Sequence, residues 1–155
     1  QAPMIFTYDT SVHSDWIDYN GHMRDAFYGL VFSYASVSLQ EQIGIDDAYR
    51  AQHQCTVYLL EDHKFFLREV HEGDALHVEM RVLDVDAKRY HLHLQMISKD
   101  QVVAVCELME LHVAQTPKPH AAPMPPEILN RLQEARIPDA ESHALAHRSR
   151  RLSLG

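Results

Sequence analysis

The sequence is poor in cysteine, in glycine and in positive charge, and each shortage narrows the possible functions. Only two cysteines occur in the 155 residues, Cys55 and Cys106. Both lie in apolar runs, so we expect reduced, buried thiols and a cytoplasmic location. The five glycines form no phosphate-binding loop. The formal net charge of -8 disfavours a nucleic-acid partner, which would need a basic face.

Long apolar runs and several enzyme motifs are also missing. No stretch approaches the roughly 20 apolar residues that cross a bilayer. The opening QAPMIFTYDT has neither the basic start nor the apolar region of a signal peptide, so we expect neither a membrane partner nor secretion. No Gly-x-Ser-x-Gly, Cys-x-x-Cys or His-Glu-x-x-His motif occurs. The 12 histidines, including His91 and His93, are interpreted as solvated side chains, so no metal site is expected.

The length and composition of the chain fit one soluble globular domain. The hydrophobic fraction is 46% and the charged fraction 23%, which is ordinary for a packed protein. A chain of this length has room for a single substantial core. We expect one domain over residues 1–136, followed over residues 137–155 by a polar, basic tail that we expect to be mobile.

The order of patterns predicts one long helix followed by an antiparallel sheet. Residues 24–43 carry apolar side chains on most faces and Gly44 supplies a stop, so this helix is expected to be enclosed on several sides. Alternation and turn residues predict extended segments at 4–12, 55–60, 63–70, 75–86, 88–98 and 102–115, and a short helix at 126–134. The fold class is therefore α+β, with an antiparallel sheet wrapped around one central helix.

The segment DWIDYNGHMRDAFY, residues 15–28, resembles the signature of hotdog-fold thioesterases of the 4-hydroxybenzoyl-CoA thioesterase type. The resemblance extends over about residues 5–116, and Arg24 and Asp25 depart from it because they stand where asparagines are common. It implies a hotdog fold, an acyl-CoA substrate with no cofactor beyond its coenzyme A, and a homodimer, with a tetramer left open. The matching positions are Asp18, Gly21, His22, Met23, Ala26 and Tyr28.

The resemblance and the chemistry of thioester hydrolysis together suggest a role for each residue. Asp18 is expected to act as general base or nucleophile, with Asn20 or His22 orienting the water or the carbonyl. The free amides at the helix start, those of Arg24, Asp25 and Ala26, could bind the developing oxyanion. An aspartate before a helix is more often a cap, and only its context favours catalysis. The remaining substrate-binding candidates are Trp16, Tyr19, Gly21, Phe27, Tyr28, Glu61 and His63.

The substrate is the least determined part of the prediction. The run WIDYNGHM resembles a subgroup of these thioesterases linked to carnitine breakdown, which implies a small quaternary-ammonium acyl-CoA such as betainyl-CoA. A medium-chain or aromatic acyl-CoA is the broader expectation. Two alternatives stay open. One is a hotdog-fold acyl-CoA hydratase or dehydratase, and the other is a non-catalytic acyl-CoA-binding domain.

Overall fold

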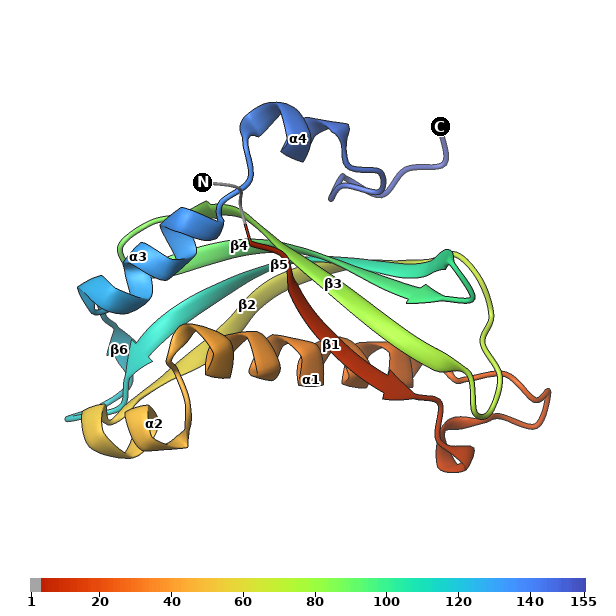
Figure 1. The fold of residues 1–155 in the computed structure, drawn as a ribbon, viewed down its shortest axis with the longest axis horizontal. Coiled ribbons are helices and arrows are strands. Elements are labelled where there is room, and N and C mark those ends of the chain that lie inside the picture. Colours follow the sequence, from red (N-terminus) through yellow and green to blue (C-terminus); the bar gives the residue numbers. More distant parts are fainter. Residues whose placement is uncertain (1–3) are drawn as a thin grey trace.

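A curled antiparallel sheet encloses one long helix. The computed structural model describes residues 4–155. Figure 1 shows helix α1 on one side of the sheet, with helix α4 and the C-terminal segment on the other. The sheet order is β1-β3-β4-β5-β2, with β6 beside β5. The strands are β1 (Phe6–Ser11), β2 (Cys55–Phe66), β3 (Ala75–Val85), β4 (Arg89–Ser98), β5 (Gln101–Ala114) and β6 (His120–Ala121). The helices are η1 (Ser14–Trp16), α1 (Asp25–Ile43), α2 (Asp47–His53), α3 (Pro126–Ala135) and α4 (Asp139–Ala144).

Helix α1 begins and ends where its sequence directs. Asp25 places a negative charge in the first turn, where the helix dipole favours it. Gly44 ends the helix with φ of 104°, and its N–H closes the last turn on carbonyls of Gln40 and Glu41. The predicted helix at 24–43 is thereby confirmed. Its fully buried apolar side chains are Val31, Phe32, Ala35, Leu39 and Ile43.

The core lies between α1 and the concave face of the sheet. Alternate residues of β3, β4 and β5 point toward α1, and each such side chain contributes about 1.5–3 kcal/mol when fully buried. Within residues 4–155, no helix is both long and apolar enough to cross a membrane. The core members from β3 and β4 are Val78, Met80, Val82, Leu92, Leu94 and Met96.

Strand β2 differs from the prediction in one instructive way. The segments predicted at 55–60 and 63–70 are joined in a single strand that ends at Phe66, so residues 67–70 are not part of it, and its pairing with β5 shifts between Leu59 and Glu61. Leu60 is the extra residue of this β-bulge. Before the bulge, Val57 and Leu59 face α1, and after it the even-numbered residues do so. Glu61 consequently faces the outer surface of the sheet.

Helix α2 was missed by the sequence analysis. It is seven residues long, too short for a clear periodic pattern. Its start is fixed by Asp46, whose side chain accepts a hydrogen bond from the Tyr49 N–H at 2.9 Å. The Tyr49 hydroxyl then bonds His112 Nε2 at 2.8 Å. Because both of these side chains are buried, the bond fastens α2 to β5.

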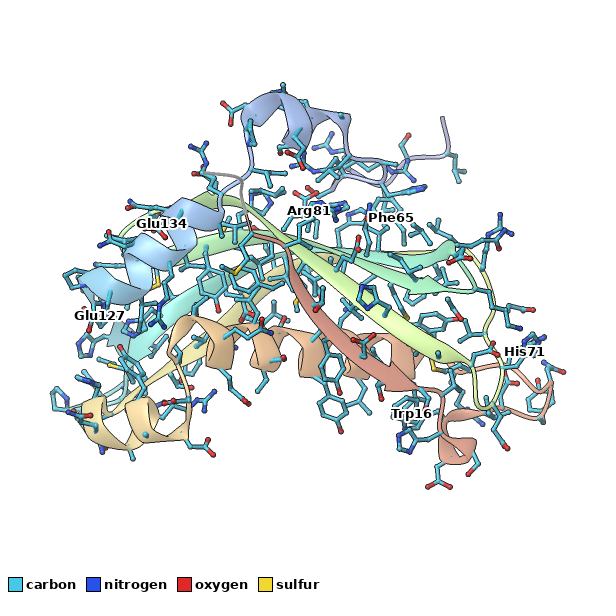
Figure 2. The ribbon with its side chains drawn as sticks, in the orientation of Figure 1. Trp16, Phe65, His71, Arg81, Glu127 and Glu134 are labelled. Atoms are coloured by element: carbon cyan, nitrogen blue, oxygen red, sulfur yellow. The ribbon has the colours of Figure 1, made fainter. Side chains whose placement is uncertain are left out.

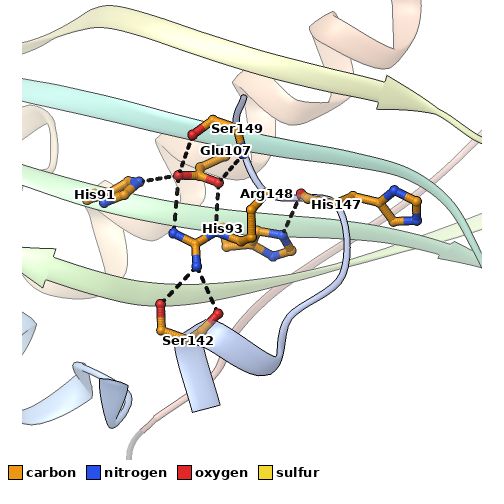
Figure 3. A network of polar contacts seen from close by, with 7 residues as sticks. All are labelled: His91, His93, Glu107, Ser142, His147, Arg148 and Ser149. Carbon is orange, nitrogen blue, oxygen red and sulfur yellow. Dashed lines mark hydrogen bonds and ion pairs between the residues drawn. The ribbon is translucent and has the colours of Figure 1, made fainter. Parts of the chain in front are cut away.

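The C-terminal segment, for which the sequence analysis predicts mobility, lies across the outer face of the sheet. Figure 3 shows the contacts that hold it there. Glu107 accepts hydrogen bonds from Arg148 Nε and from the Ser149 N–H, both at 2.8 Å. His91 Nε2 lies 2.7 Å from the same carboxylate. The outward-facing carboxylate of Glu107 on β5 is thereby compensated by Arg148, from the basic sequence RSRR.

The same segment changes the environment of the strand-face histidines. His93 was interpreted as solvated, yet the segment covers it completely and its exposed fraction is 0%. Its Nε2 lies 3.3 Å from the carbonyl of His147. Burial lowers the pKa of His93, so the neutral imidazole is favoured.

Candidate active site

The segment between β1 and α1 folds into a tight loop around Asp18. Ile17 and Met23 form an antiparallel bridge that closes the loop. Within it, the Asp18 N–H donates to the His22 carbonyl at 2.9 Å, and the Gly21 N–H donates to the Asp18 carbonyl at 3.0 Å. Gly21 has φ of 82°, a conformation that side chains rarely adopt. The Asn-Gly sequence therefore builds the turn that presents Asp18 just before the helix.

The Asp18 carboxylate is oriented by backbone amides. Its Oδ1 accepts hydrogen bonds from the Asn20 N–H at 2.8 Å and the His22 N–H at 3.2 Å. The His22 amide is the main cause of a lowered pKa at Asp18. Among residues 4–155 no hydrogen bond is made to Oδ2. The group is thus an ionised carboxylate with one oxygen fixed and one available, suited to accept a proton or attack a carbon.

His22 is held by a residue that the sequence analysis missed. Its Nε2 lies 3.0 Å from Glu69 Oε2. The adjoining backbone is fixed as well, because the Met23 N–H donates to the Val70 carbonyl at 3.0 Å. Glu69 lies in an irregular segment after β2 and belongs to no motif, so no sequence signal marked it. The contact of Glu69 with the His22 ring supports a positioning role for His22 beside Asp18.

A cavity of about 250 Å³ lies between the first turn of α1 and the end of β2. The Tyr28 hydroxyl donates to the Arg68 carbonyl at 3.0 Å, and the Tyr28 ring meets Phe66 edge-on at 5.5 Å. These contacts make two of its walls rigid. The lining residues are Met23, Asp25, Tyr28, Phe66, Leu67, Arg68 and Glu69.

One of the three predicted oxyanion donors is not available. The Arg24 N–H donates to the Trp16 carbonyl at 3.0 Å, so it is already used. Arg24 is the N-cap residue of α1 and has an extended backbone. Its bond to Trp16 lies next to the bridge between Ile17 and Met23 that closes the loop. The N–H groups of Asp25 and Ala26, the first two helical residues, have no carbonyl four residues back within the helix. These two amides remain candidate donors beside the cavity.

The aromatic candidates separate into supporting and lining residues. Trp16 is 9% exposed, stacks on Phe27 at 5.7 Å and also contacts His13 at 4.4 Å. Figure 2 shows Trp16 and His71 at the same end of the molecule. Tyr19 is 93% exposed. Of the predicted aromatic residues, Tyr28 therefore lines the cavity, whereas Trp16 and Phe27 support the loop from behind.

Glu61 and His63 are not brought to the Asp18 loop within this subunit. Both line a depression of about 420 Å³ on the outer face of the sheet, together with His91 and Ser149. The bulge at Leu60 is the reason, since it sets which side chains of β2 point outward. Among residues 4–155, no three histidine, cysteine, aspartate or glutamate side chains group as a metal site would require.

A second cavity, of about 350 Å³, lies between α1 and the strands β2 and β5. It contains Glu110, which the sequence analysis also missed and which is only 4% exposed. Burial raises the pKa of Glu110 to about 7. A signal did exist in the sequence, because Glu110 interrupts the apolar alternation of β5 at a position that faces the core.

Two curated relatives resemble the chain closely. It is 42% identical to a betainyl-CoA thioesterase of Pseudomonas aeruginosa over 144 residues, which is 92% of this chain and 87% of that protein. It is 37% identical over 139 residues, 85% of this chain, to an L-carnitine dehydrogenase/betainyl-CoA thioesterase of Agrobacterium fabrum. The match covers 28% of that longer relative.

Solved structures share the same architecture. A Staphylococcus aureus protein in complex with CoA has a TM-score of 0.80 at 27% identity, with 96% of this chain and 98% of that chain covered. A Pseudomonas putida protein has a TM-score of 0.77 at 32% identity, with 100% and 99% covered. The predicted hotdog fold is thereby confirmed. Residues 12–132 also match the sequence family described as the thioesterase-like superfamily. The chain therefore belongs to the thioesterase-like superfamily, and it is a hotdog-fold hydrolase of thioesters.

Proposed function

We propose that this chain hydrolyses betainyl-CoA, or an acyl-CoA with a similarly small cationic head, to the free acid and CoA. The relative from Pseudomonas aeruginosa supports the substrate. The observation that carries the proposal is the Asp18 carboxylate, fixed by two amides in the loop that leads into α1. In this proposal CoA enters only as the leaving group of the substrate, and no further cofactor takes part.

The proposed reaction uses this chain's own groups. Asp18 Oδ2 either takes a proton from the attacking water or attacks the carbonyl carbon itself, and both routes remain open. The N–H groups of Asp25 and Ala26 bind the oxyanion that forms. The carbon–sulfur bond then breaks: on the first route the thiolate of CoA takes the proton held by Asp18, and on the second it takes a proton from water. On the second route water then hydrolyses the anhydride formed with Asp18, which releases the free acid and restores the carboxylate. Glu69 keeps His22 in place, and His22 orients the water or the carbonyl.

We further propose that two subunits pair through the free edge of β2. This strand ends the sheet, and an unpaired edge offers its backbone groups to another strand. Tyr58, Leu59 and Leu60 are 42%, 54% and 49% exposed, so the edge is also apolar. A two-fold axis would make the pairing antiparallel. A cytoplasmic location accords with the unpaired thiols of Cys55 and Cys106.

A charge on this edge is expected to break the dimer. Leu60 lies near the middle of β2, so the two-fold axis of the proposed dimer brings the Leu60 side chains of the two subunits close together. Leu60→Lys would then place two positive charges side by side, and the dimer should dissociate to monomers with a loss of activity. Light scattering after size exclusion measures the mass. Leu154→Lys, at a fully exposed position, is the control and should stay dimeric. A Leu60→Lys protein that remains a dimer would count against this interface.

The test of the function is a set of acyl-CoA esters with release of free thiol followed over time. Betainyl-CoA is expected to be the preferred substrate over acetyl-CoA, decanoyl-CoA and benzoyl-CoA. Crotonyl-CoA tests the main alternative, because a hydratase would add water to its double bond without releasing thiol. Binding of the esters without any turnover would instead indicate a non-catalytic domain.

A further inference from the structure

The cavity at the start of α1 is small and acidic. It measures about 250 Å³, below the roughly 300–1,000 Å³ of pockets for drug-sized ligands, so it suits a small group. Two acids line it, Asp25 and Glu69, against one cation, Arg68. Glu69 is already engaged, because its Oε2 lies 3.0 Å from His22 Nε2. No hydrogen bond or ion pair among residues 4–155 includes the Asp25 carboxylate, so this acid is available to a ligand.

The Asp25 carboxylate lies at the same end of α1 as the amides that are candidate oxyanion donors. The first N–H groups of a helix point out of its start, and the Cα–Cβ bonds of a helix tilt toward that same end. Asp25 and Tyr28 are three residues apart, which places them on one face of α1, and both line the cavity. The carboxylate therefore borders the space into which its own N–H can donate.

Aromatic side chains complete the lining of this cavity. Phe66 is 52% exposed, so part of its ring surface is open to a ligand. The Tyr28 ring is held beside it, because the Tyr28 hydroxyl donates to the Arg68 carbonyl at 3.0 Å. A quaternary ammonium group carries charge but cannot donate a hydrogen bond from nitrogen, so it binds best to an anion and to aromatic faces. Asp25, Tyr28 and Phe66 supply both.

The length of a betainyl group places its charge within reach of Asp25. The nitrogen lies about 2.5 Å from the carbonyl carbon, so it is at most about 4 Å from the carbonyl oxygen, from ordinary bond lengths. In the proposed reaction that oxygen accepts the Asp25 N–H at about 2.9 Å. The Asp25 carboxyl carbon is three bonds from the same amide nitrogen, at most about 4 Å away. One residue of one subunit can thus contact both the oxyanion and the cation.

We propose that Asp25 selects the cationic acyl group, by contacting the quaternary ammonium of the substrate with its carboxylate while its N–H binds the oxyanion of the same substrate. This inference rests on the proposed function. A cationic head offsets the repulsion between the Asp25 carboxylate and the developing oxyanion. An uncharged head of the same shape leaves that repulsion in place, so its ester reacts more slowly.

The decisive comparison uses two substrates of equal shape. Betainyl-CoA carries a trimethylammonium group, and 3,3-dimethylbutyryl-CoA carries an uncharged carbon in its place. With Asp25→Asn, which keeps the size of the side chain, kcat/KM for betainyl-CoA should fall about tenfold, between the scales of an exposed and a buried ion pair. The value for the neutral ester should stay equal or rise. A ratio of the two values that is the same in the wild type and in Asp25→Asn would overturn the proposal.

The ratio also separates this role from a purely structural one. Asp25 stabilises the start of α1 through the helix dipole, and loss of that effect alone would slow both esters alike. Glu127→Gln is the matched control, because Glu127 is an exposed acid in the first turn of α3, away from the cavity. It should alter neither value.

A binding measurement separates this proposal from the proposed function. Two CoA thioethers without a carbonyl serve as probes, one with a 2-(trimethylammonio)ethyl group and one with a 3,3-dimethylbutyl group. Calorimetry should show that the wild type binds the cationic thioether more tightly and that Asp25→Asn binds both equally. If this holds while betainyl-CoA is not hydrolysed, the cation site stands and the proposed function fails. If betainyl-CoA is hydrolysed and the wild type binds both thioethers equally, the cation site fails. Asp25→Ser, which also suits a helix start, replaces the asparagine variant should that variant not fold.

Discussion

Asp18→Asn is expected to lower kcat for thioester hydrolysis by at least about 100-fold, the usual scale for loss of a base or nucleophile. Asparagine keeps the size of the side chain, and its Oδ1 can still accept the hydrogen bonds from the amides of Asn20 and His22. The loop should therefore keep its shape while the charged oxygen is lost. Free thiol release from saturating acyl-CoA gives kcat, and a melting curve checks the fold.

The control for this substitution lies in the same region of the chain. Asp15, in the short helix η1, is exposed, and Asp15→Asn should leave kcat unchanged. If Asp18→Asn hydrolyses the substrate within a few-fold of the wild-type rate, the carboxylate is a turn residue only. The assignment of the site would then have to move to another group at the start of α1.

Glu107→Gln is expected to destabilise the protein by about 3 kcal/mol at pH 7. Burial by itself would raise the pKa of Glu107, but hydrogen bonds from Arg148, Ser149 and His91 outweigh it and lower the pKa from 4.5 to about 2. A carboxylate with a lowered folded-state pKa stabilises the fold above pH 4.5. That stabilisation is lost as the pH falls from about 4.5 through 2, where the folded carboxylate takes up its proton.

Urea unfolding at several pH values checks this directly. The free energy of unfolding of the wild type should decline between pH 4.5 and pH 2, and that of Glu107→Gln should change less in the same range. Glu134→Gln, an exposed glutamate on α3, serves as the control and should follow the wild type. Parallel curves for wild type and Glu107→Gln would show that the C-terminal segment does not depend on this carboxylate.

The central helix and most strands were predictable because their signals are local. The apolar faces of residues 24–43 and the glycine that follows them specify α1 without reference to any distant residue. The turn at Lys99 and Asp100 is marked by its polar residues, of which Asp100 is a type that tolerates the positive φ of 63° found there. The position of Asp18 came from a motif, and its two amide contacts lie within four residues.

The features that were missed depend on contacts between distant segments. Glu69 meets His22 only after the chain has returned along β2, and Arg148 meets Glu107 from 41 residues away. The Arg24 amide was predicted to be free, and its bond to Trp16 follows from the shape of the loop. Glu110 is visible in the sequence as an acid among apolar residues, but only the fold shows the cavity around it.

The bulge in β2 has a consequence for which strands can pair with this edge. Leu60 lies opposite no residue of β5, so a chain lacking it could keep every other partner in that pairing. Such a shortened strand would lose its local bend and present a straighter, apolar border. A straight apolar edge pairs readily with strands of other chains, which would compete with the proposed partner subunit and lead toward aggregates. One surplus leucine would thus act as a safeguard of solubility, a task separate from catalysis.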